Sequence, residues 1–175
     1  MKTKHIVTLI LARENPSSIL HSARTAVAAV VSLLVARLLR LPDAYWASIT
    51  SLIVMQSTFG AALPISAQRF AGTAVGAVCG ALASTYFHSN IMIYGITIFV
   101  IGLVCAALRI ERTAYRYASI TLAIVMLVAR PASAWLVAAH RFVEVSLGIV
   151  VALALSAVWP ERQTVTQTTS AAPTQ

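Results

Sequence analysis

Two long apolar runs constrain this chain more than any other feature. Phe70–Phe87 and Ile91–Leu108 each contain eighteen residues without a charged side chain. A helix of about 20 apolar residues crosses the roughly 30 Å hydrocarbon core of a bilayer, because in lipid every backbone N–H and C=O group must find its partner within the segment. Neither run has the polar stripe at helical period that a soluble helix bundle requires. The two runs therefore predict membrane-spanning helices.

Four further segments are apolar in their middle. They are Ile19–Leu39, Ala44–Gln68, Ala114–Arg130 and His140–Trp159. Of the 175 residues, 59% are hydrophobic and only 10% are charged, which is far from the composition of soluble domains. We therefore expect an all-α polytopic membrane protein with six transmembrane helices.

The predicted membrane module covers residues 17–160. Residues 1–16 combine lysines with an apolar stretch but lack a small-residue cleavage site, so we expect a cytoplasmic segment lying along the membrane surface. Residues 161–175 are polar and without periodicity, and we expect a disordered cytoplasmic tail.

The basic residues, which give the chain a net charge of +8, predict its orientation. With the N-terminus inside, nine lie on the cytoplasmic side and four outside. The nine are Lys2, Lys4, Arg13, Arg24, Arg69, Arg109, Arg112, Arg116 and Arg162, and the four are Arg37, Arg40, Arg130 and Arg141. This positive-inside bias places both termini in the cytoplasm and accounts for most of the charge without a nucleic-acid partner.

The chain contains two similar segments. Ala47–Gln56 (ASITSLIVMQ) and Ala118–Leu127 (ASITLAIVML) are identical at seven of ten positions. The likeness continues in QRFAGTAVGAV from Gln68 and HRFVEVSLGIV from His140. Each copy would hold three helices, an odd number, so the second would enter the membrane in the opposite sense. The repeat predicts a 3+3 inverted architecture, as in many secondary transporters, unless the match is chance similarity between membrane helices.

Small residues in both copies predict close helix packing. Gly72, Gly76 and Gly80 recur at every fourth position and form a groove that a second backbone can approach. Gly148 occupies the corresponding position in the second copy.

A glutamate replaces the first glycine of this groove in the second copy. Glu144 matches Gly72, and Arg141 lies three residues earlier on the same helix face, where it can neutralise the carboxylate. A carboxylate within a membrane helix costs a few kcal/mol (about 2.5–3.5 on insertion scales) unless it is paired or reaches water. Glu144 is therefore a candidate for proton coupling.

Three arginines are candidates for a substrate path. Arg24 lies about a turn and a half inside the first predicted span, while Arg69 and Arg141 open the third and sixth. A guanidinium group carries a permanent charge, and its planar donor fork matches a carboxylate. Tyr45 and Trp46 are candidates for the external mouth of the same path. The alternative is that the arginines anchor helices at lipid headgroups and the aromatic pair belongs to the interfacial belt.

No pattern in the sequence points to catalysis. The five acidic residues are scattered, and no metal-ligand spacing, phosphate loop or nucleophile elbow is present. Cys79 and Cys105 fall inside apolar runs, where we expect them to pack as small apolar side chains. We expect no enzymatic activity, no cofactor and no metal site.

Three further motifs are YWASIT from Tyr45, the Gln-Ser-Thr-Phe-Gly run from Gln56 and QRFAGTAVGAVCGAL from Gln68. They resemble motifs of the fusaric acid resistance and aromatic acid exporter superfamily. The family's Arg-x-x-Gly-Thr-x-x-Gly element corresponds to Arg69, Gly72, Thr73 and Gly76, and the end of its six-helix module resembles Arg141 through Gly148 to Trp159-Pro160.

The resemblance implies a bacterial inner-membrane exporter of small, aromatic carboxylate anions that uses the proton gradient and works with a periplasmic adaptor protein. Typical members add a large cytoplasmic domain or a second module, so a short module implies a homo-oligomer or a subunit of a larger exporter. Two alternatives remain at this stage: an oligomeric anion channel, and an accessory membrane subunit that transports nothing.

Overall fold

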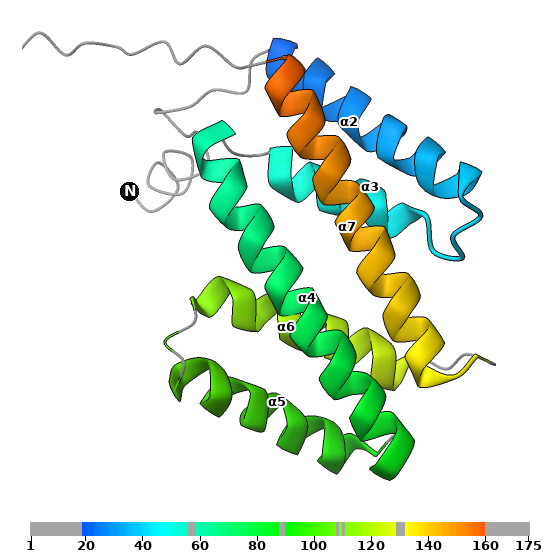
Figure 1. The fold of residues 1–175 in the computed structure, drawn as a ribbon, viewed down its shortest axis with the longest axis vertical. Coiled ribbons are helices and arrows are strands. Elements are labelled where there is room, and N and C mark those ends of the chain that lie inside the picture. Colours follow the sequence, from blue (N-terminus) through cyan, green and yellow to red (C-terminus); the bar gives the residue numbers. More distant parts are fainter. Residues whose placement is uncertain are drawn as a thin grey trace, which may run out of the picture.

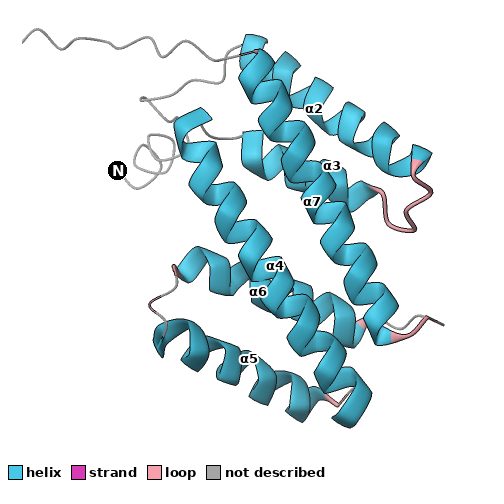
Figure 2. Cartoon of the chain, viewed as in Figure 1, coloured by secondary structure: helices cyan, strands magenta, loops and turns pink. Residues whose placement is uncertain are grey.

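The computed structural model describes residues 19–55, 59–87, 90–107, 109, 111–128 and 132–159. These residues form helices joined by short loops, with no strand among them (Figure 2). The helices are α2 (Ile19–Leu38), α3 (Tyr45–Met55), α4 (Phe59–Phe87), α5 (Ile91–Ala107), α6 (Arg112–Leu127) and α7 (Ala134–Val158). The predicted all-α class is confirmed for this part of the chain. The predicted N-terminal segment and C-terminal tail lie outside it.

Three of these helices are long and apolar enough to cross a membrane, namely α2, α4 from Gly60 onward, and α7. The apolar helices α3 and α5 are shorter, with 11 and 17 residues, and α6 has 16. At about 1.5 Å of rise per residue, α3 extends only about 16 Å, roughly half the hydrocarbon thickness.

The predicted second span, Ala44–Gln68, is wrong. The structure divides this segment between α3, which ends at Met55, and α4, which begins at Phe59. Pro64 lies inside α4, in its second turn. A proline there removes one hydrogen bond near the helix start, where several N–H groups already lack partners within the helix.

The predicted start of the sixth span at His140 is also wrong. Helix α7 begins at Ala134, where the hydroxyl of Ser133 accepts a hydrogen bond from the Leu136 N–H at 3.4 Å and caps the first turn. Arg141 is therefore the eighth residue of α7, and Arg69 is the eleventh of α4. Neither arginine opens its helix.

Helices α4 and α7 form the centre of the molecule and run in opposite directions (Figure 1). Helices α2 and α3 pack on α7, and α5 and α6 pack on α4. The molecule thus has two flanks, each built from two helices, on either side of a central antiparallel pair.

The outer helix α2 buries its small and polar side chains and exposes its large apolar ones. Its buried residues recur at every fourth position and are Arg24, Ala28, Ser32 and Ala36. Its exposed residues include Val27, Val30, Leu34 and Leu38. This is the reverse of a soluble helix, and it suits a helix whose outer face contacts lipid.

Glycines bring α4 into backbone contact with α6. A Cβ atom at Gly72 or Gly76 would overlap the carbonyl group of Ala114 or Ala118, respectively. At Gly80 a Cβ would lie 3.0 Å from the Cβ of Val125. Only glycine at positions 72 and 76 permits so short a distance between the backbones of α4 and α6.

Helix α7 approaches α3 in the same way. A Cβ at Gly148 would overlap the carbonyl group of Ala47. Gly148 matches Gly76 in the sequence repeat, and Ala47 matches Ala118. Equivalent residues of the two copies therefore make equivalent contacts, each between helices of different copies.

Candidate functional site

Arg69 projects from α4 into the interior, where its side chain is only 5% exposed. Its Nε and Nη2 atoms donate hydrogen bonds to the Thr50 hydroxyl on α3, at 3.3 and 3.0 Å. Its Cζ atom lies 4.8 Å from the ring centroid of Tyr117 on α6, in a cation–π contact. No carboxylate of the described residues forms an ion pair with it.

Arg141 projects from α7 and is 2% exposed. Its Nη1 atom donates to Glu144 Oε2 at 3.1 Å, and its Cζ atom lies 3.6 Å from the ring centroid of Trp46. The second oxygen of Glu144 accepts a hydrogen bond from the Asp43 N–H at 3.0 Å, just before α3 begins. A carboxylate at this end of α3 also interacts favourably with the helix dipole.

The two arginines occupy matched positions of the repeat and contact matched aromatic residues. Trp46 precedes the first ASIT copy as Tyr117 precedes the second. Next to the arginines, the rings of Phe70 and Phe142, another matched pair, lie against each other with their centroids 4.8 Å apart. The two halves of the chain therefore meet at this point.

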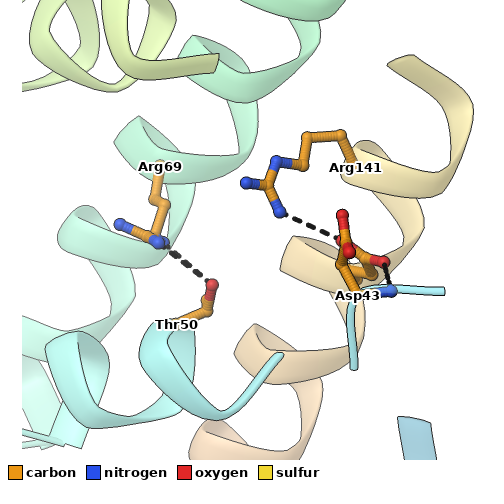
Figure 3. A network of polar contacts seen from close by, with 5 residues as sticks. Asp43, Thr50, Arg69 and Arg141 are labelled. Carbon is orange, nitrogen blue, oxygen red and sulfur yellow. Dashed lines mark hydrogen bonds and ion pairs between the residues drawn. The ribbon is translucent and has the colours of Figure 1, made fainter. Parts of the chain in front are cut away.

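A small cavity lies between the two arginines. Its volume is about 20 Å³, which is room for one water molecule. Its walls are Trp46, Arg69, Thr73, Tyr117, Ile120, Thr121, Ile124, Arg141 and Val145. Figure 3 shows Arg141 extending from α7 toward Arg69 on α4.

Two buried donors on residues that line the cavity have no acceptor among the described residues. They are Nη2 of Arg141 and Nε1 of Trp46. A buried donor without an acceptor is destabilising by about 1–3 kcal/mol, and more when the donor is charged. The arrangement thus places the positive charges of Arg69 and Arg141 beside the cavity.

Comparison with known proteins places the chain in a family. It matches the fusaric acid resistance protein-like family over residues 27–155, well over half its length. The chain belongs to this family. The inner membrane protein YeeA of Escherichia coli (strain K12) is 25% identical over 146 residues, which cover 82% of this chain and 42% of the relative. The chain thus spans less than half the length of this relative. No solved structure matches the chain.

This membership confirms the family resemblance of the sequence motifs. Together with helices able to span a membrane, it makes the chain a multi-pass membrane protein of a transport-related family, with a relative in the bacterial inner membrane.

Four of the six residues that the sequence suggested for a substrate path lie together. Arg69, Arg141 and Trp46 line the cavity, and Glu144 pairs with Arg141. Tyr45 is half-exposed, and its ring stacks beside that of Trp46 at 5.6 Å between centroids.

Arg24 lies elsewhere. It is buried and donates to the carbonyl of Trp159, at the opposite end of α7 from Arg141. The 18 residues that separate Trp159 from Arg141 correspond to about 27 Å of helix. Arg24 does not line the cavity.

The candidate residues did not include Thr50, Tyr117 and Thr121. Thr50 binds Arg69, and the other two line the cavity. The signal for them was the repeat itself, because both copies read aromatic-Ala-Ser-Ile-Thr, as Trp46–Thr50 and Tyr117–Thr121. The repeated aromatic residue and threonine are the ones that face the arginines.

Proposed function

We propose that this protein exports small, aromatic carboxylate anions across the bacterial inner membrane. The proposal is carried by the two buried guanidinium groups of Arg69 and Arg141, which line one cavity where the halves of the molecule meet. An anion that leaves water needs fixed positive charge and donors to replace its hydration, and paired guanidinium groups supply both.

We further propose that the module is a 3+3 inverted repeat whose six helices all cross the membrane, with both termini in the cytoplasm. The matched contacts of Gly76 and Gly148, and the opposite directions of α4 and α7, support this arrangement. The short helices α3 and α6 lie against α7 and α4, so protein rather than lipid covers much of their backbone.

Glu144 is the proposed site of proton coupling. It holds one donor of Arg141 in an ion pair and is itself only 1% exposed. Protonation would weaken its ion pair with Arg141 and so change the charge beside the cavity. This change is the proposed link between proton movement and anion movement.

The cavity is too small for the proposed substrate. A volume of about 20 Å³ admits one water molecule but no aromatic ring. Transport would require the flanks to move relative to α4 and α7, with the Phe70–Phe142 contact as part of the closed barrier.

The decisive experiment is uptake and release of a panel of small carboxylates, benzoate among them, in proteoliposomes with purified protein. We expect Arg69→Ala and Arg141→Ala to lower flux at least tenfold, since each removes a charged hydrogen-bond donor of the path. Arg37→Ala is the matched control, because Arg37 is an exposed arginine in the last turn of α2. Equal flux in the folded variants and wild type would refute the proposed path.

Collapsing the proton gradient separates a coupled exporter from a channel. Coupled export should fall when an ionophore removes the gradient, and Glu144→Gln should lose this dependence. Flux that persists without a gradient, together with single-channel currents, would instead identify an oligomeric anion channel.

The small cavity also favours a second candidate, an accessory subunit that transports nothing. This subunit would bind a larger exporter or a periplasmic adaptor protein. Absence of flux in correctly assembled wild-type protein would move the assignment to this role.

A further inference from the structure

The charges around the cavity are distributed unevenly between the two arginines. Arg141 has Glu144 as its ion-pair partner. Asp43 lies beside Glu144, half-exposed and outside the cavity wall. Arg69 forms no ion pair with any described residue; it donates hydrogen bonds to the Thr50 hydroxyl and lies over the Tyr117 ring.

A glycine explains this difference. Gly72 occupies the position in the first copy that Glu144 occupies in the second, and its contact with the carbonyl of Ala114 leaves no room for a side chain. Helix packing at α6 therefore removes the carboxylate that would neutralise Arg69. A buried, permanently charged guanidinium without a counter-charge is strongly destabilising.

The cavity wall indicates where a counter-charge would be held. Arg141, Trp46 and Arg69 all line it, so two guanidinium groups flank the same small volume. The hydroxyl-bearing residues Thr73 and Thr121 complete the polar part of its wall. The described wall contains no carboxylate.

We propose that this cavity holds a resident monovalent inorganic anion of halide size, bound between Arg69 and Arg141. The volume of about 20 Å³ fits one ion little larger than a water molecule and is too small for an aromatic carboxylate. The anion is the missing counter-charge of Arg69. This inference concerns the resting protein and does not depend on transport.

Trp46 provides an internal reporter for the test, because bromide quenches indole fluorescence on contact. The other two tryptophans, Trp135 and Trp159, are exposed and can be replaced by phenylalanine. In detergent-solubilised protein, bromide replaces gluconate at constant ionic strength. We expect the bromide to quench Trp46 fluorescence in a saturable way. Chloride should reverse it by competition.

Variants test which charges hold the ion. Arg69→Gln should weaken bromide binding about tenfold, since it removes a charged hydrogen-bond donor, whereas Arg69→Lys should keep most of it. Glu144→Gln should tighten binding because it removes the competing negative charge. Arg37→Gln, on an exposed part of α2, should leave binding unchanged.

A measurement on the wild-type protein tests the inference even if the variants fail to fold. Chloride in place of gluconate should raise Tm in a saturable way, because an ion that binds only the folded state stabilises it. Quenching that stays linear in bromide concentration, or a Tm that is equal in chloride and gluconate, would overturn the inference. Saturable halide binding without carboxylate flux would refute only the proposed function, and flux without halide binding would refute only this inference.

Discussion

At the scale of single residues, the buried arginines are the most informative feature of the molecule. Their sequence positions suggested helix ends, where a long side chain can extend to lipid headgroups. The structure instead buries Arg69 and Arg141 between helices, with aromatic rings over both guanidinium groups. Such burial supports the proposed role of the two arginines in anion recognition.

Thr50 should be essential for holding Arg69, since its hydroxyl accepts both hydrogen bonds of that guanidinium group. We expect Thr50→Val to lower the free energy of unfolding by about 1.5–3 kcal/mol, the usual range for a hydrogen bond to a charged group. Denaturant titration in detergent micelles measures this change.

Thr97→Val is the matched control. The Thr97 hydroxyl donates only to the Ile93 carbonyl of its own helix, at 2.8 Å. We expect its replacement to change stability by less than about 0.5 kcal/mol. Equal losses of unfolding free energy in the two variants would show that the hydrogen bonds between Thr50 and Arg69 do not contribute more to stability than the Thr97 bond does.

At the scale of elements, α2 and α5 are followed by residues with similar backbone conformations, although their sequences differ. α2 is followed by Arg40 at a positive φ of 54°, and α5 is followed by Arg109 at 53°. At α2, the N–H groups of Leu41 and Arg40 bond the carbonyls of Ala36 and Arg37, which is a Schellman motif. The first helices of the two halves thus share a similar backbone ending without similar sequences.

The glycine contacts give the sharpest prediction for helix packing. Gly76→Ala and Gly148→Ala should each destabilise the protein by about 1–3 kcal/mol, because the new methyl group must displace the backbone carbonyl of a facing helix. Gly95→Ala on α5 is the control, since a Cβ there meets nothing within 4 Å. We expect it to leave stability unchanged or raise it by up to about 1 kcal/mol. Thermal unfolding of the three variants in one detergent decides between these outcomes.

At the scale of the whole molecule, the antiparallel pair α4 and α7 organises everything else. Each carries an arginine and a glycine of the repeat, and each packs against the ASIT helix of the other half. The cavity therefore belongs to both halves, and any change in their relative position changes its size.

The inverted arrangement predicts that α4 and α7 start on opposite sides of the membrane. Single cysteines at Gly60 and Trp135, both exposed near these starts, report on this in a background with Cys79→Ala and Cys105→Ala. We expect a membrane-impermeant maleimide to label Trp135→Cys from outside intact cells and Gly60→Cys only after permeabilisation. Labelling of both from one side would contradict the inverted topology.

The sequence by itself determined the all-helical class, the membrane environment and the family, because uncharged apolar runs and short motifs are local properties of the chain. It also singled out Arg69, Arg141 and Trp46, which line the cavity. Its span boundaries at Gln68 and His140 were wrong, since a proline or a charged residue inside a helix resembles a helix end when hydropathy alone is considered.

Only the tertiary structure decided what these residues do together. Whether an arginine extends to the membrane surface or turns inward depends on the helices beside it, and those neighbours are distant in the chain. The same holds for Thr50 and Tyr117, which α3 and α6 bring to Arg69 because glycines on α4 and α7 allow close approach. The cavity exists because two similar halves meet there, and the contacts between them are not a local property of either sequence copy.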